Sequence, residues 1–356
     1  MATDFSKQLL KWHKTISRDM PWKSIKDPYK IWLSEIILQQ TQVSQGIPYY
    51  NTFVKRFPDV KSLAESDLDE VMALWKGLGY YSRARNLHKA AIHVMEVHKG
   101  VFPSSYEDVK AMPGVGEYTA SAICSFAYGL PHAVLDANVI RILARYYCIE
   151  EEVHKSAVQK ELKAKAKQLL DVKSPGRYNQ AIMDFGALVC KPKEPQCGNC
   201  VMVNSCLANA RGKVAELPSK KTKKPRRERY FHYFEIEQSK KLLVRQRGEK
   251  DIWHSLYELP FLETSSGRKL TNKKIERYLE EEIGGIRIIE IEKLDLTYKQ
   301  TLSHQFIHGV FYKVMLKDDL PQLKAPYLHV SWKRLKKMAI PKLIDWYIGQ
   351  KPITLH

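Results

Sequence analysis

Met112-Pro113-Gly114-Val115-Gly116 decides the fold of the N-terminal part of this 356-residue chain. The segment lies between two stretches with helical periodicity, and Pro113 ends the first of them because proline cannot continue a helix. Glycines at 114 and 116 leave the backbone uncovered, so N–H groups at the start of the second helix can approach a phosphate. The pattern predicts a helix-hairpin-helix motif, which contacts DNA backbone without sequence preference. An ordinary turn between packed helices remains the alternative.

Helical periodicity extends outward from this hairpin over residues 1–215, where strand-like alternation is absent. The segment Ile31–Leu38 is apolar at nearly every position and should form a buried helix. Other helices are expected at Leu87–Val97, Glu117–Tyr128, Val139–Tyr147, Val158–Leu170 and Tyr178–Val189, with one more beginning near Phe5. Residues 1–215 are therefore predicted to form a mainly α domain.

The pattern changes after residue 215. Residues 216–229 carry seven basic and two acidic residues and no apolar face, which predicts an extended linker. Residues 230–356 then show alternation, and we expect a small α+β domain there. Its predicted strands are Tyr230–Glu237, Lys241–Arg247, Ile286–Glu292 and Phe306–Leu316, and its predicted helix is Asn272–Ile283.

Four cysteines follow the last helix of the first domain with the spacing C-x6-C-x2-C-x5-C. They are Cys190, Cys197, Cys200 and Cys206. Four thiolates so close in sequence can surround one centre, either zinc or an iron–sulfur cluster. The uneven spacing and the basic prong with Lys191 and Lys193 favour a cluster in the loop 190–206, while a structural zinc knuckle stays open.

The composition points to a polyanionic partner. The chain holds 58 basic and 39 acidic residues, a net charge of +19, and solubility alone needs far less. Such an excess suits nucleic acid or an anionic membrane surface. No apolar stretch approaches a membrane span, and the first residues have no signal-peptide core. Clustered cysteines suit a reducing interior, and Cys124 and Cys148 are expected in the core.

Two carboxylates are candidates for acid–base chemistry. Glu35 has the apolar helical neighbours Ile31, Trp32 and Leu38, so desolvation should raise its pKa and make it a proton donor near neutral pH. Asp136 should cap the following helix, and this structural role by itself explains an aspartate at that position. Together, a protonated acid and an ionised carboxylate form the pair that cleaves a glycosidic bond.

These motifs resemble one family. Trp32-Leu-Ser-Glu-Ile-Ile-Leu-Gln-Gln-Thr-Gln42, Gly77-Leu-Gly-Tyr-Tyr-Ser-Arg83, Pro113-Gly-Val-Gly-Glu-Tyr-Thr119 and the cysteine array occur in the order found in MutY-type adenine DNA glycosylases. That family belongs to the helix-hairpin-helix, endonuclease III-like superfamily. The resemblance covers nearly the whole chain and implies removal of adenine paired with 8-oxoguanine, and also with guanine, from flipped-out nucleotides in base excision repair.

The resemblance also implies roles for individual residues. Glu35 would protonate the adenine, Asp136 would stabilise the cationic sugar, and Tyr118 and Asn138 would position Asp136 and the nucleotide. The cysteines would hold a 4Fe-4S cluster. Bifunctional relatives carry lysine at position 118, so tyrosine predicts weak strand cleavage or none. The expected DNA contacts are Gln40, Thr41, Leu78, Gly79, Tyr80, Gly114, Val115, Gly116, Lys191 and Lys193, with Tyr80 as a wedge between bases unless it packs in the core.

The C-terminal domain resembles the Nudix-like domain of the same family, which recognises 8-oxoguanine. Ser303 and His304 match its lesion-recognition loop, although Leu302 replaces the usual phenylalanine. Tyr278 replaces a metal-binding glutamate of the Nudix box, so nucleotide hydrolysis is not expected. Ala137 and Lys23 also depart from the family pattern without removing a carboxylate.

Three other classes of function stay open. These are an endonuclease III-like lyase, a DNA-binding module without activity and an active Nudix hydrolase. Base release by the Glu35 and Asp136 pair would exclude the second class. We expect a monomer that binds mismatched double-stranded DNA and no membrane. Its expected location is the cytoplasm with the nucleoid in a bacterium, or the nucleus in a eukaryote.

Overall fold

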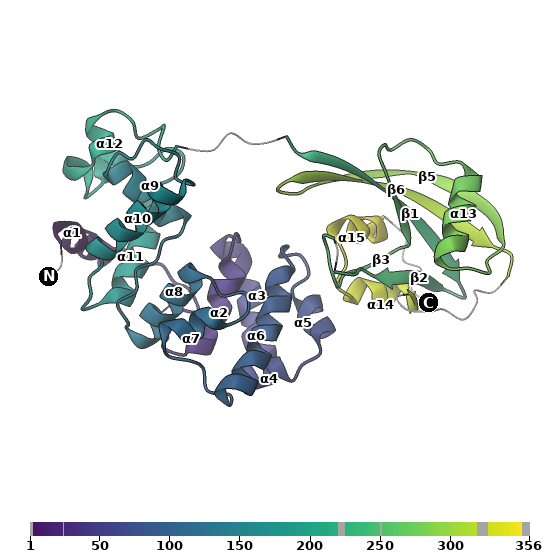
Figure 1. Cartoon of the computed structure of the whole chain (residues 1–356), viewed down its shortest axis with the longest axis horizontal. Coiled ribbons are helices and arrows are strands. Elements are labelled where there is room, and N and C mark those ends of the chain that lie inside the picture. The colour runs from purple at the N-terminus through teal and green to yellow at the C-terminus, as the bar shows by residue number, and fades with distance from the viewer. Residues whose placement is uncertain (1–2, 24, 220–224, 250, 319–326, 351–356) are drawn as a thin grey trace. The chain divides into compact units, whose positions relative to one another are not determined.

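The computed structural model describes residues 3–23, 25–219, 225–249, 251–318 and 327–350. The chain divides into two compact units, and each is discontinuous in sequence (Figure 1). The first comprises Met1–Ser66 and Arg85–Lys223, and the second comprises Asp67–Ala84 and Lys224–His356. The predicted domain limits at residues 215 and 229 remain predictions, since the units are defined by packing and group Asp67–Ala84 with the C-terminal part.

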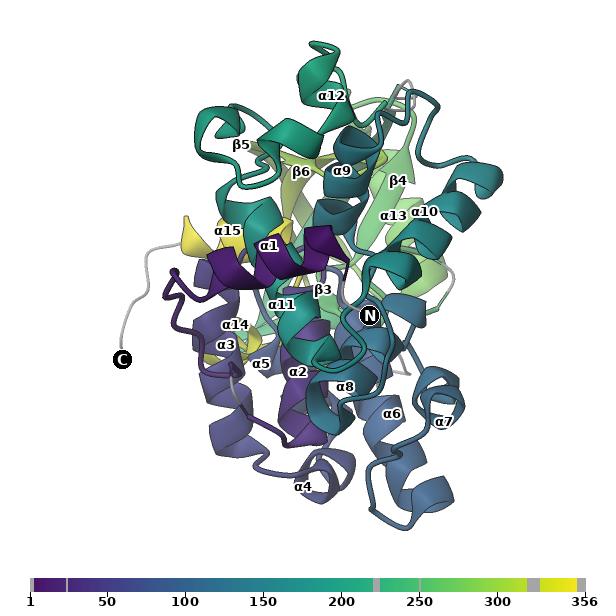
Figure 2. The ribbon, with the colours of Figure 1, turned by 90° about the vertical axis from the view of Figure 1, so that its left-hand side faces the viewer.

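The first unit is built from helices, as the sequence predicts. They are α1 (Asp4–His13), α2 (Pro28–Leu38), α3 (Val43–Arg56), α4 (Val60–Ala64), most of α6 (Ser82–His98), α7 (Tyr106–Ala111), α8 (Glu117–Tyr128), α9 (Ala137–Tyr146), α10 (Ser156–Leu169), α11 (Pro175–Leu188) and α12 (Leu207–Ala210). In Figure 2, α1 crosses α11. The ring centroids of Trp12 and Phe185 lie 5.0 Å apart at this crossing.

Helix α2 runs through the core, because nearly all its side chains are apolar. Its residues Ile31 to Ile37 are all buried, and the indole of Trp32 is fully enclosed. Asp27 caps the helix with its side chain, and Pro28 occupies the first turn, where a missing N–H costs nothing. Helix α2 packs on α8, so residues of both helices meet in one interior.

The second unit contains a seven-stranded mixed sheet, together with α5 (Leu68–Leu74). The strands are β1 (Arg227–Gln238), β2 (Lys241–Gln246), β3 (Tyr257–Glu258), β4 (Phe261–Thr264), β5 (Ile288–Thr301), β6 (Gln305–Leu316) and β7 (Tyr327–Ser331). The main order is β3-β2-β1-β6-β5, with β4 on β1 and β7 on β2. Strands β1 and β6 are parallel, and the other pairs are antiparallel.

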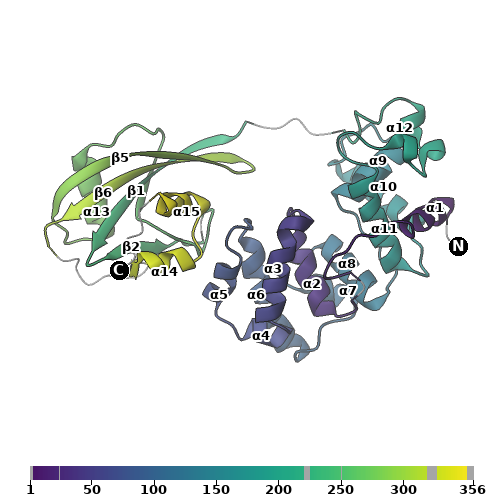
Figure 3. The same ribbon diagram turned by 180° about the vertical axis from the view of Figure 1, so that it is seen from behind.

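Both faces of this sheet are covered by helices (Figure 3). Alternation along β1 explains how, since Phe231 and Tyr233 pack with α15 (Lys342–Gly349), while Phe234 and Ile236 pack with α13 (Asn272–Glu282). Helix α14 (Trp332–Lys337) adds Leu335 to the first of these cores. The central strands are therefore buried on both sides, whereas β5 forms an edge.

The structure corrects two sequence-based expectations. Residues 216–229 are not an extended linker throughout, because Leu217 is buried and residues 227–229 already belong to β1, paired with β6. Residues 220–224 lie outside the described residues. Strand β5 continues to Thr301, nine residues beyond the predicted end at Glu292. Strands β3, β4 and β7 were not predicted, since each is too short to show a period.

Candidate active site

The hairpin between α7 and α8 has the expected geometry. Gly114 has φ +75°, and a side-chain carbon there would lie 2.6 Å from Cβ of Asn86, so only glycine fits. Gly116 is the N-cap of α8 and has open space around it. Both glycines are exposed, whereas the Val115 side chain is buried. The backbone of residues 114–116 is thus the part of the hairpin that a phosphate can approach.

Glu35 lies on the buried part of α2 and is 7% exposed. Burial raises the pKa of its carboxyl to about 7, because the charged form loses its hydration. A hydrogen bond with the Tyr118 hydroxyl opposes this rise in pKa, and the negative charge of Asp136 adds to it. These interactions place three candidate residues from α2, from α8 and from the N-cap of α9 in one site.

Asp136 is held by two donors at the start of α9. Its carboxylate accepts from the backbone N–H of Val139 at 2.7 Å and from Nδ2 of Asn138 at 2.8 Å. Tyr118 is half-buried, and burial followed by the charges of Glu35 and Asp136 raises the pKa of its hydroxyl well above the usual range. It therefore stays neutral and can donate, with the sulfur of Met183 at 3.4 Å as one partner.

An arginine that sequence reasoning missed connects this site to the cysteine loop. Arg141 is 6% exposed and donates through NH2 to Oδ1 of Asn138 at 2.8 Å and to the carbonyl of Gly186 at 2.8 Å. Its Nε donates to the carbonyl of Cys190 at 2.8 Å. Arg145, one turn further, donates to the carbonyl of Lys191 at 2.7 Å. The spacing of positions 138, 141 and 145 places these side chains on one helix face, which is the available sequence signal.

The four cysteines line a single pocket, together with Arg145, Gln196, Asn209 and apolar side chains. Burial raises the pKa of the Cys200 thiol to about 11, and the charges of the other three add to this rise, which shows that all four are near one another. Within the described ranges, no three of the His, Cys, Asp and Glu side chains are arranged to hold a metal ion. Four thiols around one pocket match the donor set of a 4Fe-4S cluster, whose irons bind separate thiolates.

The Gly77–Arg83 segment belongs to the second unit, and two side chains hold its backbone by hydrogen bonds. Arg83 donates through NH2 to the carbonyl of Gly79 at 3.1 Å, and the indole N–H of Trp75 donates to the same oxygen at 3.0 Å. Tyr80 has φ +48° and is 49% exposed, whereas Leu78 is buried. The aromatic ring of Tyr80 is therefore accessible in this loop, as are Gly77 and Ser82.

Tyr80 and Ser303 meet within the second unit. The hydroxyl oxygen of Tyr80 lies 2.8 Å from Oγ of Ser303. Ser303 and His304 are both exposed in the turn between β5 and β6. In the first unit, Gln40 is exposed with φ +56°, Thr41 is half-buried, and Lys193 is exposed beside a half-buried Lys191.

Two side chains of helix α13 contact the sheet through polar groups. The Tyr278 hydroxyl donates to the carbonyl of Phe261 at 2.5 Å. Glu282 accepts from the Tyr327 hydroxyl at 2.8 Å, and NH1 of Arg245 lies 3.6 Å from it. The prediction that this domain does not hydrolyse nucleotides remains a prediction.

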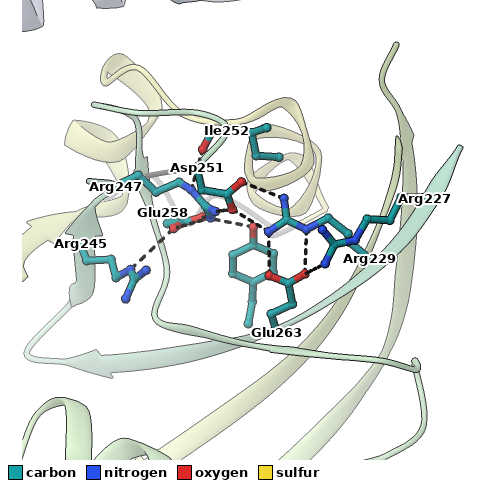
Figure 4. A network of polar contacts seen from close by, with 9 residues as sticks. Arg227, Arg229, Arg245, Arg247, Asp251, Ile252, Glu258 and Glu263 are labelled. Atoms are coloured by element: carbon teal, nitrogen blue, oxygen red, sulfur yellow. Dashed lines mark hydrogen bonds and ion pairs between the residues drawn. The ribbon is translucent and has the colours of Figure 1, made fainter. Parts of the chain in front are cut away.

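A partly buried network of charges joins the first four strands of the second unit (Figure 4). NH1 of Arg247 donates to both carboxylate oxygens of Glu258 at 2.9 Å, and Glu258 is fully buried. Arg229 donates to Glu263 at 2.7 Å and to Asp251 at 2.9 Å. Arg247 also donates to Asp251 at 2.7 Å. The network fixes the first residues of β1 against the β2–β3 loop and β4.

Two family models match this chain. Residues 33–168 match the HhH-GPD superfamily of base excision DNA repair proteins, and residues 232–350 match the NUDIX domain. These matches define the class as a helix-hairpin-helix base excision repair protein with a Nudix-type C-terminal domain.

Curated relatives identify the family within that class. The chain is 38% identical over 258 residues to the adenine DNA glycosylase of Buchnera aphidicola subsp. Baizongia pistaciae, covering 72% of this chain and 73% of the relative. It is 30% identical over 414 residues to the Homo sapiens adenine DNA glycosylase, covering 99% of this chain and 76% of that one. The chain therefore belongs to the adenine DNA glycosylase family, whose members are enzymes that hydrolyse N-glycosidic bonds.

Solved structures agree with the fold of the helical part. A thermostable thymine-DNA glycosylase superposes with a TM-score of 0.53 at 28% identity, covering 58% of this chain and 95% of that structure. An endonuclease III–DNA complex gives a TM-score of 0.51 at 18% identity, which supports the fold alone. Among the helices that the structure describes, none has the length and apolar character needed to cross a membrane.

Proposed function

We propose that this enzyme removes adenine paired with 8-oxoguanine in double-stranded DNA, and also adenine paired with guanine, leaving an abasic site. The observation that carries the proposal is the buried Glu35, with a pKa of about 7, in electrostatic contact with Asp136 and Tyr118. A carboxyl with this pKa is half protonated near neutral pH, as a general acid requires. The family to which the chain belongs supplies the choice of base.

In the proposed reaction, Glu35 donates its proton to the ring of the flipped-out adenine, which makes the base a better leaving group. The N-glycosidic bond breaks with both electrons going to the base. The Asp136 carboxylate, oriented by Asn138 and Val139, stabilises the cationic sugar until water adds to it. Tyr118 holds Glu35 and cannot form the Schiff base that a lysine would form, so base release without efficient strand cleavage is proposed.

Other residues are proposed to hold DNA and the cofactor. The backbone at Gly114 and Gly116 would bind a phosphate, Tyr80 would stack on or between bases, and Gln40 and Thr41 would line the lesion site. Ser303 and His304 would recognise the base opposite adenine. Cys190, Cys197, Cys200 and Cys206 would hold a 4Fe-4S cluster that supplies structural stability to the loop with Lys191 and Lys193. The enzyme would act as a monomer, in the cytoplasm with the nucleoid in a bacterium or in the nucleus in a eukaryote.

A single-turnover assay tests the activity. Duplexes with adenine opposite 8-oxoguanine, guanine or thymine are incubated with excess protein, and alkali-cleaved product is measured. We expect rapid release opposite 8-oxoguanine, slower release opposite guanine and little opposite thymine. Glu35→Gln and Asp136→Asn should abolish release while duplex affinity is retained. Unchanged release in both variants would contradict the assignment.

Two further measurements separate the alternatives. A protein–DNA adduct trapped efficiently by borohydride would favour a lyase over a monofunctional glycosylase. A visible-absorption spectrum of the purified protein with the broad bands of an iron–sulfur chromophore supports the cluster, and a colourless protein with stoichiometric zinc contradicts it.

A further inference from the structure

The turn between β5 and β6 is a tight hairpin whose tip consists of Ser303 and His304. The turn is closed by the backbone N–H of Leu302, which donates to the carbonyl of Gln305 at 2.9 Å. Both tip residues are exposed. The central peptide of a tight hairpin has different orientations in different turn types, so groups that contact it influence which orientation is adopted.

The last residues of the basic segment hold this tip. The backbone N–H of Arg227 donates to the carbonyl of His304 at 3.1 Å. The side chain of Arg226 donates through Nε to the carbonyl of Ser303 at 3.4 Å. Two successive carbonyl groups of the tip are therefore bound by two successive arginines, one through its backbone and the other through its side chain.

An aromatic ring at the start of β6 holds the Arg226 side chain. The guanidinium carbon of Arg226 lies 5.2 Å from the ring centroid of Phe306. Nζ of Lys299 lies 3.8 Å from the same centroid. Each such cation–π contact favours one orientation of a long side chain. The exposed Arg226 side chain thus contacts both Phe306 and the tip.

Fixing a carbonyl also fixes the next amide. The peptide unit is planar and trans, so its C=O and N–H point in opposite directions. When the Ser303 carbonyl points toward Arg226, the N–H of His304 points away from it. The hydroxyl of Ser303 is contacted separately, by Tyr80. The orientation of the tip amide thus depends on Arg226, and that of the hydroxyl does not.

We propose that Arg226 is a positioning residue for recognition of the base opposite adenine, acting by fixing the Ser303–His304 peptide. This inference rests on the proposed function, in which the same tip contacts 8-oxoguanine. Arg226 would not need to touch DNA for this role. Its loss would reduce the preference for 8-oxoguanine over guanine more than it reduces general affinity for duplex DNA.

The adjacent arginine provides a matched control. Arg227 carries the same charge one residue away, but its side chain is 75% exposed and forms a loose pair with Glu263 at 3.8 Å. Replacing Arg227 by glutamine keeps its backbone donor to His304. Arg226→Gln and Arg227→Gln therefore remove equal charge from the same segment, and only Arg226→Gln removes the side-chain contact with the tip.

The experiment compares rate constants for adenine release opposite 8-oxoguanine and opposite guanine, under single turnover with saturating protein. We expect Arg226→Gln to lower the ratio of the two rate constants about fivefold, equivalent to about 1 kcal/mol. Arg227→Gln should change the ratio by less than about twofold from the wild-type value. Phe306→Leu should lower the ratio as Arg226→Gln does, since the guanidinium loses the ring that it contacts. Melting temperatures are measured for all variants, and Arg226→Gln should have the melting temperature of the wild-type protein.

The outcomes are distinguishable. Equal loss of preference in Arg226→Gln and Arg227→Gln would assign the effect to charge and overturn the proposal. An unchanged ratio in Arg226→Gln would overturn it as well. If the wild-type protein releases no adenine from any duplex, the proposed function itself fails and this inference fails with it.

Discussion

At the scale of single residues, Glu35 sets the expected pH dependence of the reaction. Its carboxyl must be protonated to act as an acid, and burial raises its pKa to about 7. The single-turnover rate of adenine release should therefore be constant well below pH 7 and fall by about tenfold per pH unit well above it. In the Glu35→Gln variant adenine release should be lost, at least about 10²–10⁴-fold below the wild-type rate, at every pH tested. A rate that rises through pH 7 would contradict the role.

The same residue should lower stability at alkaline pH. A carboxyl whose pKa is raised on folding stabilises the native state below its unfolded pKa of 4.5, and this contribution is lost as pH rises to about 7. Glu35→Gln removes the ionisable group. From pH 4 to pH 8, the free energy of unfolding of the variant should therefore rise by roughly 3 kcal/mol relative to that of the wild-type protein. Denaturant unfolding at both pH values measures this.

A suitable control is Glu65→Gln. The Glu65 side chain is 64% exposed, so this variant makes the same substitution without removing a buried group, and the pH dependence of its unfolding is measured in the same way. If Glu65→Gln and Glu35→Gln changed it equally, burial of Glu35 would not be the cause.

Some site residues could be predicted from the sequence and others could not. Glu35 was predictable because three apolar neighbours on its own helix indicate burial. Arg141 and Arg83 were missed, because an arginine in a helix is usually solvated. Arg141 donates to a backbone carbonyl that is distant in sequence, that of Cys190. Arg83 donates to the carbonyl of Gly79, in the loop that precedes its helix. Such contacts depend on the packing of helices, which local periodicity does not contain.

At the scale of elements, the hairpin between α7 and α8 can be tested through Gly114. Gly114→Ala places a side-chain carbon 2.6 Å from Cβ of Asn86 at a φ of +75°. Both effects distort the turn, so affinity for duplex DNA should fall for every sequence tested and stability should fall by about 1–3 kcal/mol. Fluorescence anisotropy with matched and mismatched duplexes measures the affinity.

The opposite end of α8 supplies the control. Gly129 also has positive φ, +66°, but a Cβ added there would have no other atom within 4 Å. Gly129→Ala should therefore cost about 1 kcal/mol of stability without lowering DNA affinity. A similar affinity loss in both variants would mean that general destabilisation, and not the hairpin, explains the effect.

The charge network in Figure 4 makes a second prediction at this scale. Arg247→Met leaves the carboxylate of Glu258 fully buried without its main partner, which should cost about 3–5 kcal/mol in the second unit. Adding Glu258→Gln should recover much of this loss. Arg277→Met removes an exposed pair with Glu281 at 3.9 Å and should change stability by less than about 0.5 kcal/mol. Unfolding followed by tryptophan fluorescence measures all three.

Secondary structure was predictable where a periodic segment was long. Helices of the first unit fulfil this condition, and so do β1 and β6. Strand β3 has only two residues and β4 only four, too few for a period to be recognised. The far half of β5 was missed because an edge strand exposes alternate residues, and its charged side chains resemble a loop. Residues 227–229 were assigned to a linker by charge, although pairing with β6 makes them a strand.

At the scale of the whole molecule, the net charge of +19 should dominate binding. Each phosphate neutralised by lysine or arginine releases counterions, so log K falls linearly with log salt concentration. If about 6–10 phosphates are contacted, affinity for duplex DNA should fall by about 10³–10⁵ between 50 and 200 mM salt. This loss should be nearly the same for duplexes with adenine opposite 8-oxoguanine and for fully paired duplexes, because phosphates carry no sequence information.

The rate of adenine release at saturating protein should change little with salt, since Glu35 is buried and its charge is screened weakly. Anisotropy titrations at several salt concentrations, paired with single-turnover rates, measure both quantities. An affinity independent of salt would mean that the basic side chains do not face the DNA.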